Sequence, residues 1–388
     1  MNSNLYLPDG VEDLLPPAAW HFEDLRRSVL DLFVRWGFQY IDPPVVEYLD
    51  ALLVAAGADL DLQTLKTLDQ ISGRQLGVRA DLTSQAMRID SQRYQGQGVQ
   101  RFCYAGPVVF ASPISTNKSR VPFKAGVEIF GADSLEADAE IINLMVEVTS
   151  LLGITSPVLL LGHMGIYRAL TRALLEAGEL EAIDEPKLFR SIQLKSQTDI
   201  DRLLKPSRLS SFMKKLPMLM MDDLEEAKQQ LKGAPDGVAV ALLELVKLVD
   251  LVDVSSTSLR FDVAELTGYG YHNGPVYSLY HPRFGSALAQ GGRYDGLGDS
   301  GEAGSRPATG FDIDLKLFLT ETEPRSEDLI FAPFVEGNKK VDLMIEVAEL
   351  RQQGRLVVCA LSKDEVPPKF CTHHLVNGKS RWTVVQNI

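Results

Sequence analysis

Apolar side chains recur at intervals of three and four residues in three long parts of the chain. Residues 17–36 show this spacing, and prolines before the segment and Gly37 after it mark its ends. Residues 136–152 repeat the pattern and precede another glycine. Residues 163–252 are also largely helical in pattern, with prolines and glycines as breaks. We therefore expect many amphipathic helices.

Strand patterns alternate with these helices. Residues 38–48 contain a Pro-Pro pair, which removes backbone donors and favours an edge strand or an interface. Residues 64–79 alternate around Ser72-Gly73 and predict a β-hairpin. Further strands are expected at 101–110, 124–131, 157–162, 258–263, 274–280 and 286–291.

The last part of the chain changes its pattern. The glycine- and serine-rich stretch 298–309 predicts a mobile loop, and 310–319 is expected to be a helix. Strand, helix and strand then predict a βαβ unit with one more strand after it, at 329–334, 338–353, 355–361 and 381–386. We therefore expect a core of residues 1–324 with a helical insertion at about 163–255, and a small C-terminal domain at 325–388.

The composition is that of a globular chain with an acidic balance. The 388 residues are 45% apolar and 23% charged, which suffices for a large core. The net charge of −13 argues against nucleic acid as a general partner, because phosphates are neutralised by clustered Lys and Arg. The three cysteines are widely spaced and fit neither a disulfide framework nor a zinc site, so no metal and no cofactor is expected. The N-terminus has no cationic leader and no apolar run reaches membrane length, which indicates a cytoplasmic protein that does not bind membranes.

Two motifs carry candidate binding chemistry. VRADLT contains Asp81 and Thr83, and KAGVEIF contains Glu128. Their oxygen atoms suit the nitrogen atoms of a ligand, since an ammonium or an imidazole seeks acceptors. The alternative is that Asp81 and Glu128 are ordinary salt-bridge partners of Arg79 or Lys124. The residues alone leave both interpretations open.

The order of motifs along residues 5–320 resembles class II aminoacyl-tRNA synthetases, and specifically the histidyl-tRNA synthetase group. The motifs are LPDGVEDLLP (7–16), FVRWGFQYIDPPVVEY (33–48), VRADLT with 101–131, LTGYGYHNGPVY (266–277), and QGGRYDGLG (290–298) with GFDIDLKLF (310–318). Five motifs in order are specific where one would be weak. The resemblance implies an α+β fold, with an antiparallel sheet flanked by helices, a helical insertion and a small C-terminal α/β domain. It also implies a homodimer through residues of about 33–48.

The resemblance also implies a histidine site. In that group an acid and a threonine hold the α-amino group of histidine, and a glutamate and a tyrosine hold its imidazole. Lys124 stands where the group has glutamine, and it either binds the ligand's carboxylate or pairs with Glu128. The residues implied for histidine binding are Asp81, Thr83, Glu128, Tyr271, Lys124 and His272.

Three arginines of the synthetases are missing. The residues at their positions are Phe110 in motif two, Thr267 in the histidine-specific segment and Leu317 in motif three. Adenylate formation depends on electrostatic stabilisation of the phosphorus centre, so their loss should abolish activation of the amino acid. A lysine does not reproduce the planar fork of arginine, so we expect no substitution by nearby cations. These cations are Lys118, Arg120 and Lys316.

The regulatory subunits of ATP phosphoribosyltransferase are a family with this profile. They are synthetase paralogues without the catalytic arginines, and residues 325–388 are similar to their short α/β tail. The resemblance implies a non-catalytic subunit in a hetero-oligomer with a short-form catalytic subunit. That assembly condenses ATP with phosphoribosyl pyrophosphate in the first step of histidine biosynthesis. The regulatory subunit activates it and binds L-histidine for feedback inhibition. The alternatives are an active histidyl-tRNA synthetase with atypical ATP anchors, or a tRNA- or protein-binding sensor on the same scaffold.

Overall fold

Two compact units, Met1–Glu323 and Pro324–Ile388, make up the chain. The computed structural model describes residues 6–53, 58–94, 97–113, 119–266, 272–294, 306–320, 328–369, 371–378 and 381–386. No helix in these ranges is long and apolar enough to cross a membrane.

The first unit is built on a nine-stranded sheet with the order β1-β5-β6-β12-β11-β10-β7-β9-β8. From β5 to β7 all neighbours are antiparallel, whereas the pairs β1–β5 and β7–β9 are parallel. The predicted α+β fold with a largely antiparallel sheet is confirmed, and the two parallel pairs make the sheet mixed. Its strands are β1 (Gln39–Tyr40), β5 (Gln100–Pro107), β6 (Phe123–Phe130), β7 (Val158–His163), β8 (Met220–Met221), β9 (Ser258–Asp262), β10 (His272–Tyr280), β11 (Ala289–Tyr294) and β12 (Ala308–Asp314).

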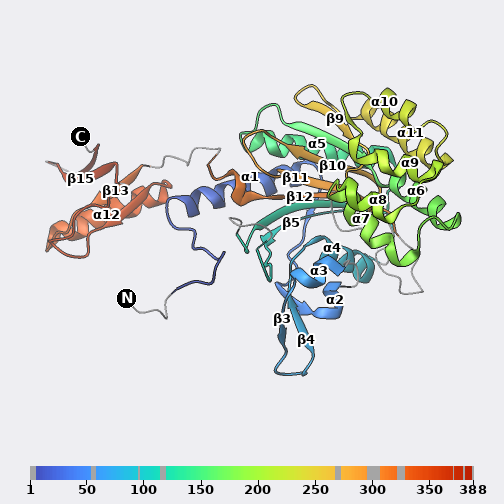
Figure 1. The fold of residues 1–388 in the computed structure, drawn as a ribbon. Helices are drawn as coiled ribbons and strands as arrows, with labels where there is room; N and C mark the ends of the chain where they lie inside the picture. Colours follow the sequence, from blue (N-terminus) through green and yellow to red (C-terminus); the bar gives the residue numbers. More distant parts are fainter. Residues whose placement is uncertain are drawn as a thin grey trace. The chain divides into compact units, whose positions relative to one another are not determined.

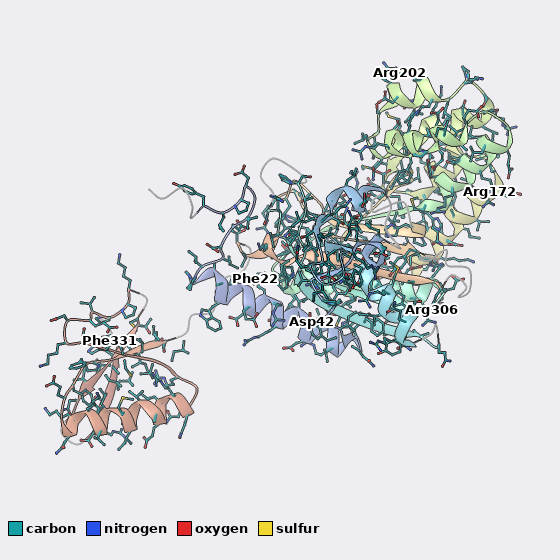
Figure 2. All side chains as sticks on the ribbon, turned by 90° about the horizontal axis from the view of Figure 1, so that it is seen from below. Phe22, Asp42, Arg172, Arg202, Arg306 and Phe331 are labelled. Carbon is teal, nitrogen blue, oxygen red and sulfur yellow. The ribbon has the colours of Figure 1, made fainter. Side chains whose placement is uncertain are left out.

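Helices α1 (Ala18–Arg35) and α5 (Leu135–Leu151) cover one face of the sheet (Figure 1). Both match the amphipathic helices predicted from the apolar spacing. The chain leaves α1 at Gly37, whose φ of +85° is a conformation that glycine adopts without strain. Phe22 lies near the start of α1 (Figure 2). Its ring packs edge-to-face on Phe123, with ring centroids 4.9 Å apart.

The opposite side of β5 carries a smaller layer (Figure 1). It contains a three-stranded sheet in the order β2-β4-β3, in which β3 and β4 form the predicted hairpin. A second apolar cluster lies here, and it includes Leu82, Phe102 and Phe110. This layer places the start of α4 over the middle of the main sheet. Its elements are β2 (Val46–Tyr48), α2 (Leu49–Leu53), α3 (Ala58–Gln63), β3 (Leu65–Leu68), β4 (Gln75–Val78) and α4 (Thr83–Ile89).

A helical segment is inserted between β7 and β9 and gathers at one end of the sheet (Figure 1). Its short strand β8 pairs with β9 and so extends the main sheet. Arg172 and Arg202 mark two of its helices in Figure 2. The helices are α6 (Met164–Glu176), α7 (Glu185–Gln193), α8 (Gln197–Leu203), α9 (Arg208–Lys215), α10 (Leu224–Gln230) and α11 (Asp236–Leu251).

The prediction of a helix at 310–319 is wrong. Residues up to Asp314 belong to β12, and only a 3-10 helix, Leu315–Phe318, follows. Phe311 and Ile313 are buried in the core, while Asp312 between them and Asp314 after them face the other side, which is a period of two. Most of the predicted loop 298–309 lies outside the described residues, and its last two residues begin β12.

The second unit is a four-stranded sheet in the order β14-β13-β15-β16 with one helix. β13 and β14 are parallel and flank α12 in the sequence, so the predicted βαβ unit is present. β15 was not predicted, because HHLVN offers only one fully buried residue, Leu375, as a signal. The elements are β13 (Leu329–Ala332), α12 (Asn338–Gln352), β14 (Leu356–Cys359), β15 (His373–Asn377) and β16 (Trp382–Gln386).

Candidate functional site

The candidate site lies on the face of the main sheet that is turned towards α4. Side chains alternate along a strand, so β6 presents Glu128 to this face and buries Val127 and Ile129 in the core on the other. Gly310 of β12 stands directly opposite Glu128 in the register. A Cβ at Gly310 would overlap the carboxylate, so glycine at this position makes the room that Glu128 occupies.

Glu128 is held by three hydroxyl groups from three different elements. Thr83 Oγ1 donates to Oε1 at 2.9 Å, and the Tyr104 hydroxyl donates to the same oxygen at 3.1 Å. The Tyr294 hydroxyl donates to Oε2 at 2.8 Å. Glu128 is only 1% exposed. We call these four residues the acid–hydroxyl cluster.

The protonation of Glu128 is unusual. Burial raises its pKa to about 8, although hydrogen bonds from Tyr294 and Thr83 act in the opposite direction. A nearby carboxylate, Asp81, raises the pKa further. A buried acid with a raised pKa favours a cationic partner, because a positive charge restores the ionised form.

Asp81 lies at the start of α4, beside this cluster. Its Oδ2 accepts from the Ser84 amide at 3.3 Å. Burial raises the pKa of Asp81, and Asp312 of β12 raises it further. Asp312 also forms an ion pair with Lys124. Three carboxyl groups and one ammonium therefore surround this part of the face, which suits a ligand that carries positive charge.

Among the described residues, no ion pair joins Asp81 or Glu128 to Arg79 or Lys124, although the charge of Asp81 contributes to raising the pKa of Lys124. Arg79 donates to the carbonyl oxygens of Pro107, at 2.8 Å, and Pro43, at 2.7 Å. Lys124 pairs with Asp312 and not with Glu128. Burial lowers the pKa of Lys124, but the charge of Asp312 outweighs this and raises it.

The position of α4 is fixed from its far side. Arg88 binds Glu47 with two nitrogens, Nε at 2.9 Å and Nη2 at 2.5 Å. Gln85 donates to the Pro44 carbonyl at 2.8 Å and to Glu47 at 2.7 Å. These bonds attach the helix that begins with Thr83 to the segment around β2.

His272 lies on β10 and is buried. Its ring stands edge-to-face to Tyr294, with centroids 6.3 Å apart, so it adjoins the acid–hydroxyl cluster. Its backbone carbonyl accepts from Arg168 of the helical segment at 2.8 Å. Tyr271 and Thr267, which were expected in the same segment, lie outside the described residues.

Apolar packing occupies two positions at which the resemblance to synthetases implies arginine. Phe110 is 5% exposed and belongs to the second apolar cluster. Leu317 packs against the main core. The described cations nearby are engaged elsewhere: Arg120 donates to the carbonyls of Phe110 and Ala111, and Lys316 pairs with Glu12. Lys118 lies outside the described residues.

Three residues of the site were not predicted from the sequence. Tyr104 lies within the motif at 101–131, but no role was assigned to it there, and its only other signal is its place in the alternation of β5. Tyr294 lies within QGGRY, where the glycines drew attention. Asp312 was assigned to a helix, which hid the fact that it faces Lys124 across paired strands.

Comparisons with known proteins agree with this architecture. A model of the family described as histidyl-tRNA synthetase matches residues 10–317, and one described as the ATP phosphoribosyltransferase subunit HisZ C-terminal domain matches residues 327–385. The solved ATP phosphoribosyltransferase regulatory subunit/histidyl-tRNA synthetase from Bacillus halodurans C has a TM-score of 0.80 at 24% identity, over 94% of both chains. Histidyl-tRNA synthetase from Nostoc sp. PCC 7120 has a TM-score of 0.75 at 15% identity, over 99% of this chain and 97% of that one. The fold is therefore that of a histidyl-tRNA synthetase-like protein of class II.

Relatives found by sequence similarity identify the family within this fold class. ATP phosphoribosyltransferase regulatory subunits are 41% identical over 388 residues in Ectopseudomonas mendocina (strain ymp) and 42% identical over 391 residues in Pseudomonas aeruginosa (strain LESB58). Each alignment covers 97% of this chain and 97% of the relative. The chain belongs to the family of ATP phosphoribosyltransferase regulatory subunits.

Proposed function

We propose that this chain binds L-histidine at the acid–hydroxyl cluster and regulates a short-form ATP phosphoribosyltransferase catalytic subunit. In a hetero-oligomer it activates the first step of histidine biosynthesis and transmits feedback inhibition. The observation that carries this is the contrast within one face of the sheet. Glu128 is buried, has a pKa raised to about 8 and lies among further acids, whereas Phe110 and Leu317 fill arginine positions with packed apolar groups.

Each residue has a distinct role in this proposal. Glu128 accepts a hydrogen bond from an imidazole N–H of the ligand, and the oxygens of Asp81 and Thr83 accept hydrogen bonds from its ammonium group. Lys124 lies on the same face of β6 as Glu128 and is paired with Asp312, and in this proposal it neutralises the ligand's carboxylate. Tyr271 and His272 complete the site. Histidine then shifts the assembly only as far as it binds the inhibited state more tightly than the active state.

The proposal also includes the absence of aminoacylation. Adenylate formation needs positive charge at the α-phosphate, and Phe110 supplies none. Self-association through residues of about 33–48 belongs to the proposal as well. Exposed apolar side chains support it, among them Val34, Tyr40, Val45, Val46 and Tyr48.

Calorimetric titration of histidine into the wild-type chain and Glu128→Gln tests the proposed site. We expect binding to weaken by about 30-fold or more in the variant, because a buried charged hydrogen bond is worth roughly 2 kcal/mol. Glu140→Gln is the control, since Glu140 of α5 pairs with Arg101 of β5 and has no contact with Glu128 among the described residues. Equal histidine affinity in the wild type and Glu128→Gln would contradict the proposed site. Histidine-dependent exchange of pyrophosphate with ATP would instead support the alternative of an active histidyl-tRNA synthetase.

A further inference from the structure

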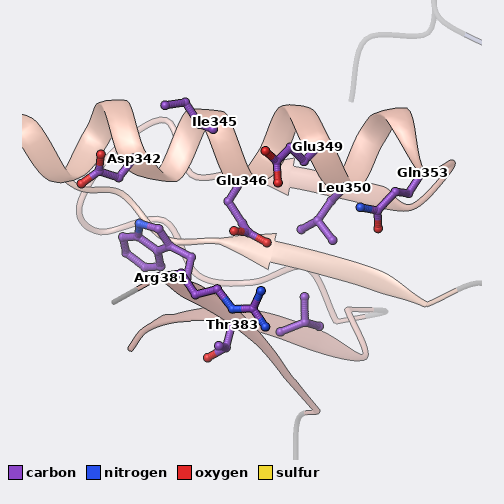
Figure 3. Close-up of a pocket in the computed structure, with 10 residues that line it drawn as sticks. Asp342, Ile345, Glu346, Glu349, Leu350, Gln353, Arg381 and Thr383 are labelled. Atoms are coloured by element: carbon purple, nitrogen blue, oxygen red, sulfur yellow. The ribbon is translucent and has the colours of Figure 1, made fainter. Parts of the chain in front are cut away.

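The C-terminal unit contains a groove of about 700 Å³ between α12 and β16 (Figure 3). The wall on the helix contains a polar stripe with spacings of four, three and four residues, together with the apolar Ile345 and Leu350. The stripe is Asp342, Glu346, Glu349 and Gln353. The wall on the strand consists of consecutive residues: Arg381, Trp382, Thr383 and Val384. Side chains of consecutive strand residues point to opposite faces of the sheet. Four consecutive residues can therefore line one wall only if the backbone edge of the strand forms that wall.

Among the described residues of the unit, no strand pairs with that backbone edge. β16 stands at the end of the four-stranded sheet, with β15 on one side only. The Gly378 amide donates to the Arg381 carbonyl at 2.9 Å. This bond determines which residues along β16 form hydrogen-bonded pairs with β15, namely Arg381 just before the strand and every second residue after it. Alternate residues therefore face β15, and the amides of Trp382 and Val384 point away from it. A free edge of this kind accepts a further strand.

The groove is acidic. Asp342, Glu346 and Glu349 have no ion-pair partner among the described residues, and Arg381 is the single cation of the lining. The described residues contain no group of three or more acids, histidines or cysteines that could hold a metal ion. Acids spaced three and four residues apart on a helix are about 4.5 to 6 Å apart along its axis, close to the ~6.7 Å between alternate residues of a strand. The stripe thus matches cationic side chains on alternate positions of an extended segment.

We propose that this groove binds an extended segment of the catalytic subunit, which adds to β16 as a fifth strand and places Lys or Arg against the acidic stripe of α12. This inference rests on the proposed function for the identity of the partner. Charge disfavours a second copy of this chain, because its own stripe is acidic and its net charge is −13. The groove also lies within residues 327–385, the part matched by the domain model named for this subunit.

The first test neutralises the stripe. We expect D342N/E346Q/E349Q to weaken association with the catalytic subunit at least tenfold, measured with full-length chains by sedimentation at low and physiological salt. The salt dependence of association should fall with it, since fewer ion pairs remain. E336Q/D364N removes two exposed acids of the same unit outside the groove and should leave the affinity within about twofold.

The second test removes a backbone donor. Val384→Pro deletes an amide that points into the groove, whereas Val384→Ala shortens the same side chain and keeps the amide. We expect the proline variant to bind the catalytic subunit at least tenfold more weakly than the alanine variant. Histidine affinity of the isolated chain should be equal in all variants, which shows that the first unit is intact.

The outcomes separate the groove from the proposed function. Unchanged association in both the neutralised and the proline variants overturns the groove, even when histidine binding and activation are normal. The proposal for the groove is also overturned if these variants lose self-association and keep association with the catalytic subunit, because the groove then binds a second copy of this chain. Failure of the wild-type chain to bind the catalytic subunit overturns the proposed function itself.

Discussion

At the scale of single residues, Glu128 shows how burial creates a binding preference. The carboxyl group is closed off by Gly310 and three hydroxyl groups, so its charge is poorly solvated. Its pKa of about 8 records that penalty. A cationic ligand stabilises the ionised carboxylate, so its binding removes part of this cost of burial.

This pKa predicts how stability depends on pH. The folded pKa of about 8 exceeds the ordinary value of 4.5, so between these values the folded chain binds more protons than the unfolded chain. The contribution of Glu128 is therefore complete below about pH 4.5 and is lost as the pH rises through 8. Relative to Glu128→Gln, the wild type should lose about 3–4 kcal/mol of unfolding free energy between pH 5 and pH 8, since each pKa unit corresponds to about 1.4 kcal/mol. Urea denaturation at both values measures this, and a constant difference would contradict the raised pKa.

At the scale of elements, α4 connects the candidate site with the segment around β2. Thr83, the first residue of α4, donates a hydrogen bond to Glu128, and Arg88 in the last turn donates to Glu47. A shift of that segment would therefore be transmitted along one rigid turn-and-a-half of helix to the acid–hydroxyl cluster. The segment around β2 belongs to the proposed dimer interface, which gives self-association a route to the site.

Arg88→Ala tests this connection. We expect the variant to lose about 1–3 kcal/mol of unfolding free energy, because the partly buried Glu47 loses a bidentate partner. Histidine affinity should fall about three- to tenfold as the start of α4 becomes less fixed. Arg93→Ala, an exposed position just beyond α4, is the control. Equal histidine affinity in Arg88→Ala and Arg93→Ala would show that α4 is held without this pair.

The elements also show what the sequence could reveal. Regular apolar spacing predicted α1, α5 and the β3–β4 hairpin, because burial of one face leaves a local pattern. Phe311 and Ile313 occur in such a pattern too, but a short alternation was mistaken for a helix end. The partners of Glu128 come from α4, β5 and β11, and only the register of distant strands brings Tyr104 and Tyr294 to one carboxylate. No local pattern contains that information.

At the scale of the whole molecule, one chain combines a synthetase-like unit with a small α/β unit. The two carry separate chemistry: buried acids and hydroxyls in the first, an acidic groove beside a free strand edge in the second. In the proposed function the first unit senses histidine, and the proposed groove of the second unit holds the catalytic subunit. Activity then resides in the assembly.

Self-association is the prediction at this scale. Val34 is 57% exposed on α1, within the proposed interface of residues 33–48. Val34→Asp should shift the chain towards monomer, since a charge in an apolar interface is costly. Val341→Asp is the matched control, because Val341 is 62% exposed on α12 outside that interface. Sedimentation of both variants measures the fraction of dimer. A dimer fraction in Val34→Asp equal to that of the wild type would show that the interface lies outside residues 33–48.

The three hydroxyl bonds of Glu128 have a consequence for timing. A ligand that reaches this carboxylate gains only the difference between its own bonds and those that Thr83, Tyr104 and Tyr294 already make. Moderate affinity and rapid release follow, since most variation in affinity lies in the dissociation rate. A receptor of this kind empties soon after the supply of its ligand falls. Its occupancy can then follow the changing concentration of a metabolite in both directions.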